Sequence, residues 1–166
     1  MCGEAANLII IGTIYSDLGE KKKALEFFNQ ALLILRVMGD KSGEASILNN
    51  ISIIHSDLGE KEKALQIINQ ALLLDRTVGD KGGEATTLSN IGRAYFILGK
   101  KEKALQYYNQ ALTLHRTVGD RYGKVATLNK IGNVYSDLGK KKEALQYLNR
   151  ALPLARAVGD RGGEAS

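Results

Sequence analysis

Apolar residues recur along the chain at helical spacing, and polar residues fill the positions between them. In the third quarter of the chain, Leu88, Ile91 and Tyr95 form one stripe, and Ala104 and Tyr108 belong to a second. Residues three, four and seven apart share one face of an α-helix, so each stripe predicts an amphipathic helix. Eight helices are predicted, near residues 4–18, 21–38, 41–58, 61–78, 81–98, 101–118, 121–138 and 141–158.

The helical pattern repeats with a period of forty residues. The dipeptide Gly-Asp falls at 39–40, 79–80, 119–120 and 159–160, so every copy has the same length. Constant length indicates copies that pack on each other in register. We therefore expect a single array over 1–166, in which residues 161–166 begin a truncated fifth repeat of a longer array. The repeats are 1–40, 41–80, 81–120 and 121–160.

Glycine and aspartate mark the predicted helix ends. Gly99 separates the two helices of the third repeat, where a left-handed backbone suits glycine. At each Gly-Asp pair the glycine can end one helix and the aspartate can cap the next, as expected for Gly79 and Asp80. Pro153 predicts a kink in the last helix, because proline removes a backbone donor and clashes with the preceding turn.

Stacking explains why the unit is repeated. A lone helix pair cannot bury its apolar stripes, whereas neighbouring pairs can bury theirs against each other. The sequence therefore predicts an all-α protein, an α-solenoid of four stacked helix-turn-helix repeats. A single proline among many Ala, Leu, Lys, Glu and Gln residues agrees with long helices.

The repeats resemble the tetratricopeptide repeat family, whose pattern is W-x2-L-G-x2-Y followed by A-x3-F. The resemblance covers essentially the whole chain and implies a right-handed superhelix whose first helices line a concave groove. The second copy departs most, with Ser52 for the glycine, His55 for the tyrosine and Ile68 for the second aromatic. The third copy supplies the matching residues Leu88, Ile91, Gly92, Tyr95, Ala104 and Tyr108.

Each copy is longer than the common 34-residue form of the family. The repeats are similar to the 40-residue variety found in cell-polarity adaptors of the LGN type. They are also similar to bacterial arrays, often cyanobacterial, that are joined to caspase-like peptidase domains. Arginine stands where the common form has its proline, at Arg36, Arg76, Arg116 and Arg156.

The resemblance implies a peptide site on the concave face of the first helices. Asparagine can donate to and accept from a peptide backbone at once, which suits a partner peptide or helix. The alternative for each residue is a merely solvated helix face. The predicted peptide-binding residues are Asn49, Asn50, Asp57, Ser89, Asn90, Arg93, Phe96, Asn129, Asn133 and Asp137.

Acidic residues form an interrupted row near the ends of first helices, at Asp17, Asp57 and Asp137. A carboxylate near a helix C-terminus is mildly unfavourable, so the row calls for an explanation. Attraction of basic peptide segments and a local hydrogen bond at the turn are the two alternatives. Arg93 is the one cation predicted in the groove, so the lysine-rich carboxylate clamp of the family is poorly matched.

Lysines cluster at 21–23, 100–101 and 140–142, where second helices begin. Stacked repeats would align them into a basic ridge, and the formal net charge of the chain is +5. Nucleic acid or an anionic membrane would suit such a ridge. A solvated edge is favoured, because no aromatic residue is interleaved for base stacking. We expect neither nucleic acid nor membrane as a partner.

No feature of the sequence supports an enzyme. His55 replaces a packing tyrosine, His115 falls near the end of a second helix, and the pair lacks metal-ligand spacing. No G-x-S-x-G, P-loop or H-E-x-x-H motif occurs. Cys2 is the only cysteine and the start of the chain lacks a signal peptide, which fits a cytoplasmic setting. We expect no catalytic residue, no metal and no cofactor.

Three function classes remain open. The favoured prediction is a non-catalytic protein-interaction module, since four repeats offer a continuous surface that one repeat lacks. The first alternative is an oligomerising scaffold that stacks end to end through exposed apolar terminal repeats. The second alternative is a regulatory arm of a larger multidomain protein.

Overall fold

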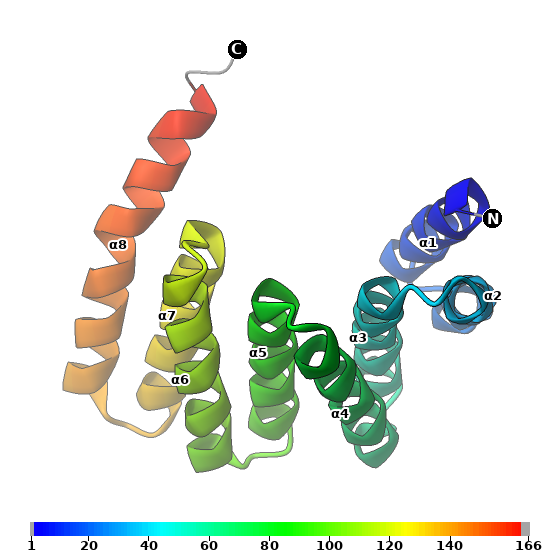
Figure 1. Cartoon of the computed structure of the whole chain (residues 1–166). Helices are drawn as coiled ribbons and strands as arrows, with labels where there is room; N and C mark the ends of the chain where they lie inside the picture. The colour runs from blue at the N-terminus through cyan, green and yellow to red at the C-terminus, as the bar shows by residue number, and fades with distance from the viewer. Residues whose placement is uncertain (1, 164–166) are drawn as a thin grey trace. The chain divides into compact units, whose positions relative to one another are not determined.

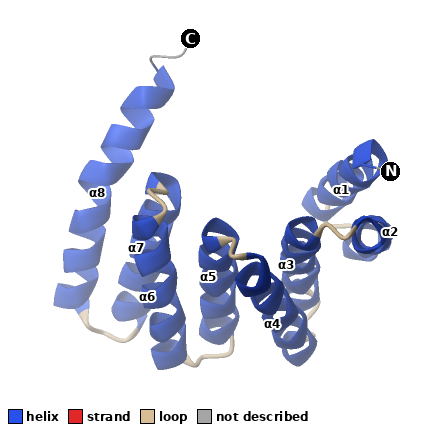
Figure 2. Cartoon of the chain, viewed as in Figure 1, coloured by secondary structure: helices blue, strands red, loops and turns tan. Residues whose placement is uncertain are grey.

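The computed structural model describes residues 2–163, which fold into eight α-helices without a strand (Figure 1; Figure 2). The predicted all-α helical-repeat solenoid is confirmed, and the predicted ends of the second to seventh helices agree to within one residue. None of the described helices is both long enough and apolar enough to cross a membrane. The helices are α1 (Cys2–Asp17), α2 (Lys21–Met38), α3 (Lys41–Asp57), α4 (Lys61–Val78), α5 (Lys81–Ile97), α6 (Lys101–Thr117), α7 (Arg121–Asp137) and α8 (Lys141–Gly163).

The chain divides into two compact units, Met1–Gly83 and Glu84–Ser166, and each is described by itself. The N-terminal unit holds the first two hairpins, α1–α2 and α3–α4. The C-terminal unit holds the hairpins α5–α6 and α7–α8, apart from the first residues of α5. The handedness of the superhelix stays a prediction.

A left-handed glycine ends the first helix of each hairpin, as predicted. Gly99 has a φ of +73°, and its N–H donates to the carbonyl of Phe96 at 2.9 Å. The next N–H, that of Lys100, donates to the carbonyl of Tyr95 at 2.9 Å. This pair of bonds satisfies carbonyls that the helix end would otherwise leave open.

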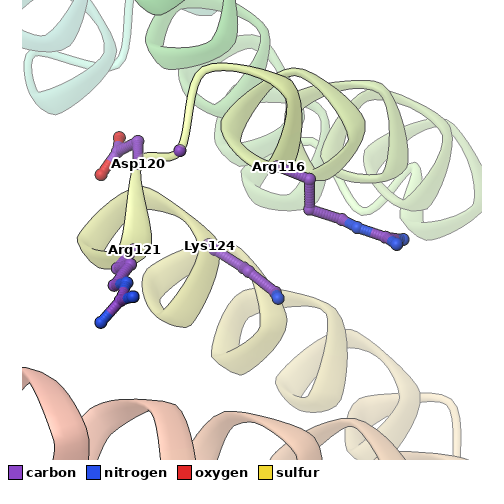
Figure 3. Close-up of a pocket in the computed structure, with 5 residues that line it drawn as sticks. Arg116, Asp120, Arg121 and Lys124 are labelled. Carbon is purple, nitrogen blue, oxygen red and sulfur yellow. The ribbon is translucent and has the colours of Figure 1, made fainter.

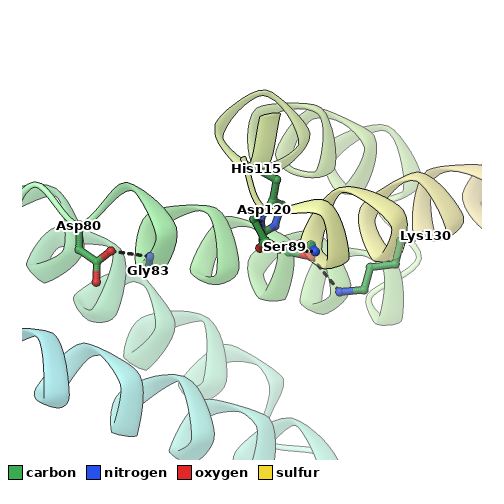
Figure 4. Close-up of polar contacts among 7 residues, drawn as sticks. Asp80, Gly83, Ser89, His115, Asp120 and Lys130 are labelled. Atoms are coloured by element: carbon green, nitrogen blue, oxygen red, sulfur yellow. Dashed lines mark hydrogen bonds and ion pairs between the residues drawn. The ribbon is translucent and has the colours of Figure 1, made fainter. Parts of the chain in front are cut away.

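The Gly-Asp pairs between hairpins also act as predicted. Gly79 adopts a φ of +72° after α4, and the Asp80 carboxylate then accepts the N–H of Gly83 at 2.8 Å (Figure 4). Asp40 and Asp120 accept from Gly43 and Gly123 in the same way, at 2.9 and 2.8 Å. Each aspartate therefore caps the helix that follows it, which stabilises that helix by about 1 kcal/mol.

In the N-terminal unit, buried aliphatic side chains of α2 and α3 form the centre of the core. Leu32 and Leu35 lie in one cluster with Ile47, Ile51 and Ile54. Full burial of such a side chain contributes roughly 1.5–3 kcal/mol each. The α2–α3 face is therefore a main source of cohesion between the first two repeats.

In the C-terminal unit, the corresponding cluster joins α6 and α7. Tyr108 and Leu112 pack with Leu128, Ile131 and Val134, all of which are buried. Phe96 of α5 packs against this cluster as a partly buried residue. The same repeat positions thus build the core of both units.

Glycine allows the two helices of a hairpin to approach closely. A Cβ atom on Gly92 would lie 2.8 Å from the Tyr108 ring, and one on Gly12 would lie 2.6 Å from the Phe28 ring. The second repeat has a serine, Ser52, and a smaller partner, Ile68. The two departures therefore compensate each other, because the smaller side chain leaves room for the serine Cβ.

Stacked aromatic rings add a second contact inside three of the hairpins. In α5–α6, the rings of Tyr95 and Tyr107 have centroids 5.3 Å apart. The second repeat has His55 and Ile67 at these positions, and His55 is buried with its Nδ1 hydrogen-bonded to the Glu60 carboxylate. The two remaining stacks pair Tyr15 with Phe27 and Tyr135 with Tyr147.

The predicted end of the last helix at residue 158 is wrong, because α8 continues to Gly163. Gly159 is helical, whereas Gly39, Gly79 and Gly119 are left-handed and begin a turn. The described residues after Gly159 continue the helical hydrogen-bond pattern of α8. The helix continues through Pro153, and the kink predicted there stays a prediction. Residues 164–166 of the predicted fifth repeat lie outside the described residues.

Candidate functional site

The predicted groove residues of the N-terminal unit all lie on α3. Asn49 is buried, and its side-chain amide donates to the Ala45 carbonyl at 3.1 Å. The Asn49 carbonyl in turn accepts from the Ser52 hydroxyl at 2.7 Å. Asn50 is half-buried, and Asp57 is the most exposed of the three predicted residues. Asn50 and Asp57 are therefore better placed than Asn49 to meet a ligand.

Asp57 pairs with a lysine of the preceding repeat. Its Oδ2 lies 3.1 Å from Nζ of Lys21, which also donates to the Ser16 carbonyl at 3.3 Å. For Asp57, this ion pair is a third explanation beside the two that the sequence left open. The lysine cation partly neutralises the Asp57 carboxylate at the end of α3 and also binds a carbonyl at the end of α1, so it joins the C-terminal ends of two first helices.

The lysines at the start of second helices reach the ends of first helices in the C-terminal unit too. Lys101 donates to the backbone carbonyl of Asp137 at 2.9 Å, and Lys141 donates to the Ser136 hydroxyl at 3.0 Å. Cations favour the carbonyls at a helix C-terminus. Lys101 and Lys141 therefore have structural partners at the ends of first helices.

In the C-terminal unit the predicted groove residues come from α5 and α7. Ser89 is buried, whereas Asn90, Arg93 and Phe96 of α5 are half-buried. The α7 residues are exposed, so their side chains can reach a ligand without rearrangement. These exposed residues are Asn129, Asn133 and Asp137.

Lys130 joins the two helices, although it was not among the predicted site residues. Its Nζ donates to the Ser89 hydroxyl at 2.8 Å (Figure 4). The same Nζ lies 5.8 Å from the centroid of the Tyr108 ring. Burial lowers the pKa of Lys130, and the positive charge of Arg93 lowers that pKa further. Lys130 is therefore a second cation close to Arg93, beside the one that the sequence predicted for the groove.

Lys130 has no carboxylate partner among the residues that the structure describes. The hydroxyl of Ser89 and the Tyr108 ring offer partial negative charge only. The Tyr108 hydroxyl remains neutral at physiological pH, because burial raises the pKa of Tyr108 to about 12 although Arg93 opposes this. The result is a half-buried centre of positive charge that can bind a carboxylate or a carbonyl oxygen.

In the sequence, Lys130 stands out only when the four repeats are aligned. The aligned residues in the other repeats are Ile10, Asn50 and Asn90, so a lysine there is exceptional. Its hydrogen bond to Ser89 crosses from α7 to α5, and the sequence pattern does not specify such contacts.

Each of the two histidines lies beside a carboxylate of its own turn. Hydrogen bonding from His55 lowers the pKa of Glu60. His115 is buried, and its Nδ1 lies 2.8 Å from Oδ2 of Asp120 (Figure 4). Both histidines therefore contribute to packing at a turn. Across the described residues, no three His, Cys, Asp or Glu side chains gather as metal ligands would.

Comparison with known proteins adds a family match. The tetratricopeptide repeat model matches residues 3–77, 43–117 and 83–157, three overlapping segments that together cover most of the chain. No curated protein sequence matches the chain.

Several solved structures are similar in fold. BtubC (BKLC) from P. vanneervenii is 23% identical with a TM-score of 0.80, covering 93% of this chain and 64% of BtubC. A Rap protein in complex with Competence and Sporulation Factor is 20% identical with a TM-score of 0.86, covering 93% of this chain and 43% of Rap. MamA is 20% identical with a TM-score of 0.68, covering 94% of this chain and 81% of MamA. The chain thus spans less than two thirds of the length of BtubC and Rap, and the likeness concerns the fold.

Proposed function

Because the chain belongs to the tetratricopeptide repeat family, we propose that it is a non-catalytic module that holds a peptide or helix of a partner protein. The family fold suggests protein–protein interaction, and one similar structure, that of Rap, is a complex with Competence and Sporulation Factor. The proposed site is the face of the first helices, with its polar centre in the C-terminal unit. A cytoplasmic location, and the lack of nucleic acid or membrane partners, belong to the same proposal.

The charge centre at Lys130 is the observation that carries this proposal. A lysine that loses hydration without gaining a carboxylate is disfavoured in its charged form, as the lowered pKa of Lys130 reflects. An oxygen ligand restores the missing interaction, and a carboxylate restores most of it. We therefore propose that the bound segment places a carboxylate or carbonyl oxygen between Lys130 and Arg93.

The exposed asparagines of α7 would extend the contact. Asn129 and Asn133 are four residues apart, so they lie on one face of the helix about 6 Å apart along its axis. Each amide can donate to a peptide carbonyl and accept from a peptide N–H. This arrangement suits an extended segment that is held mainly by its backbone.

A peptide-display selection followed by titration of the enriched peptides tests this proposal. Replacement of Lys130 by Met should weaken binding by roughly tenfold or more, because hydrogen bonds to charged groups contribute about 1.5–3 kcal/mol. Lys142→Met provides the matched control, since Lys142 is an exposed lysine of the same unit. Equal affinity of the Lys130 variant, the control and the unchanged chain would place the ligand elsewhere.

A second candidate function is self-association through the outer faces of the array. On α1, Ile10, Ile14 and Leu18 are 57%, 53% and 67% exposed. On α8, Leu145 and Leu152 are exposed as well. Apolar patches of this kind mark association surfaces. The third possibility, a regulatory arm of a larger multidomain protein, stays a prediction.

A further inference from the structure

The turn between α6 and α7 differs from the first two inter-repeat turns at three positions: Arg121 replaces a lysine, whereas Tyr122 and Lys124 change the chemical type of the residue. The first two turns read GDKSGE and GDKGGE, whereas this one reads GDRYGK. Tyr122 stands where the earlier repeats have Ser42 and Gly82, and Lys124 stands where they have glutamate. Comparison with the two earlier turns therefore shows the effect of Tyr122 and Lys124.

The first turn shows the arrangement with glutamate. The Nε of Arg36 lies 2.7 Å from Oε1 of Glu44, across the turn from α2 to α3. Lys41 and Asp40 complete the set of charged residues at this turn. Two positive and two negative side chains give a formal sum of zero, so this turn is neutral.

The turn from α6 to α7 has the same geometry but a different charge. Arg116, Arg121 and Lys124 are three cations and Asp120 is one anion, so the formal sum is +2. Together with Gly119 they line a pocket of about 250 Å³ (Figure 3). Arg116 and Lys124 extend from successive helices toward the same side of the turn (Figure 3). The salt bridge of the first turn is thus replaced by two like charges.

Asp120 already has two partners of its own. One of its oxygens accepts the Gly123 N–H at 2.8 Å, and the other lies 2.8 Å from Nδ1 of His115. The carboxylate is therefore directed at the start of α7 and at the buried histidine. The three cations of the pocket keep most of their attraction for an external anion.

A second pocket adjoins the first. Its volume is about 410 Å³, and it shares Gly119, Asp120 and Arg121 with the charged pocket. Tyr122 contributes an aromatic side chain that is 70% exposed. Ala157 and Val158 of α8 complete its lining. The second pocket is thus partly apolar and lies directly beside the cationic one.

We propose that the two pockets form one binding site for an acidic segment of a partner protein. An Asp or Glu side chain of the segment occupies the cationic pocket and contacts Arg116 and Lys124. A neighbouring apolar or aromatic side chain lies against Tyr122, since aromatic contacts supply area at little entropic cost. Tyr122 and Lys124 then contact the same ligand.

This acidic-segment site is separate from the groove of the first helices. At about 100° per residue, Lys124 lies on the opposite side of α7 from Asn133 and about 140° around the helix from Asn129. A short peptide therefore cannot occupy the acidic-segment site and the groove at the same time. The proposal goes beyond the peptide groove, and the groove variant Lys130→Met should leave it intact.

Fluorescence anisotropy on the full chain tests the proposal, with a short fluorescein-labelled peptide of glutamates that carries one central phenylalanine. Lys124→Glu restores the residue of the earlier repeats and should weaken binding by about tenfold or more, because it re-forms the salt bridge with the arginine. Tyr122→Gly, which copies the second repeat, should weaken binding by about threefold. The all-glutamate peptide should bind less tightly than the phenylalanine peptide.

The converse variant gives an independent measurement. Glu44→Lys should create a cationic turn in the N-terminal unit, so amide signals of residues 39–44 should shift with the peptide in NMR spectra. Lys142→Met should change the affinity by less than about twofold, since it removes an equal charge elsewhere. Unchanged affinity in Lys124→Glu would overturn the site. Tighter binding of a thymidine oligonucleotide by the same residues would overturn the acidic segment as its ligand.

Discussion

At the scale of single residues, Gly92 sets the separation of two helices. A Cβ atom there would approach the Tyr108 ring to 2.8 Å and the Ala104 carbonyl oxygen to 3.2 Å. Backbone atoms cannot move aside as a flexible side chain can, so α5 and α6 would have to separate. We expect Gly92→Ala to lower the free energy of unfolding by roughly 1–3 kcal/mol, the usual range for overpacking. Urea denaturation followed by circular dichroism measures this change.

Gly82→Ala is the matched control for that substitution. Gly82 lies in the first turn of the same helix, and an added Cβ would meet only Asp80, at 3.5 Å. Alanine favours the helix over glycine by about 1 kcal/mol, so this variant should be as stable as the unchanged chain or more stable. If Gly92→Ala were as stable as Gly82→Ala, the Tyr108 ring would have moved aside at no cost in stability.

At the scale of helices, the second hairpin lacks the ring stack of the other three. His55 and Ile67 occupy the places that Tyr95 and Tyr107 fill in the third repeat. Introducing both rings, His55→Tyr with Ile67→Tyr, should produce a favourable coupling of about 1 kcal/mol beyond the sum of the single changes. The single change at His55 alone also removes the hydrogen bond to Glu60, so it should destabilise the chain.

A double-mutant cycle in denaturant measures this coupling. The same cycle with Ile67→Leu supplies the control, because leucine fills space without a ring. Its coupling to His55→Tyr should be close to zero. Equal couplings for tyrosine and leucine would show that volume alone, and no ring geometry, joins α3 to α4.

The helices also show which structure a repeated sequence can predict. The end of α4 and the start of α5 were predictable because Gly79 and Asp80 act locally, through a left-handed backbone and a side-chain cap. The end of α8 was not, because Gly159 has the same local sequence as its counterparts. After Gly39 and Gly119 the next helix packs on the one before it, whereas among the described residues no helix follows α8.

Contacts between helices limited the prediction of the site in the same way. Asn49 fitted the groove by its position, yet its amide donates to its own helix and its side chain is buried. Lys130 fitted no pattern, and its role depends on the distance between α7 and Ser89. The repeat specified which helices carry the candidate residues, but only the packed structure shows which side chains are exposed.

At the scale of the whole molecule, repetition buries the same face in some copies and exposes it in others. Ile54 and Val134 are buried, whereas Ile14, which occupies the same repeat position in α1, is exposed. Leu112 is 7% exposed and its counterpart Leu152 is 48% exposed. The exposed faces on α1 and α8 correspond to the two sides of the contact that joins neighbouring repeats inside each unit.

These two faces predict end-to-end association of separate chains. A head-to-tail contact of this kind does not close on itself, so the average mass should rise continuously with concentration above the 18.1 kDa of one chain. Replacing Ile10 and Ile14 by Glu should return the mass to that of one chain, because each burial would then desolvate a carboxylate. Multi-angle light scattering over a range of concentrations measures the mass. Leu73→Glu is the control, since Leu73 is an exposed leucine of α4 and should leave association unchanged. A mass that stays at 18.1 kDa at every concentration would contradict end-to-end association.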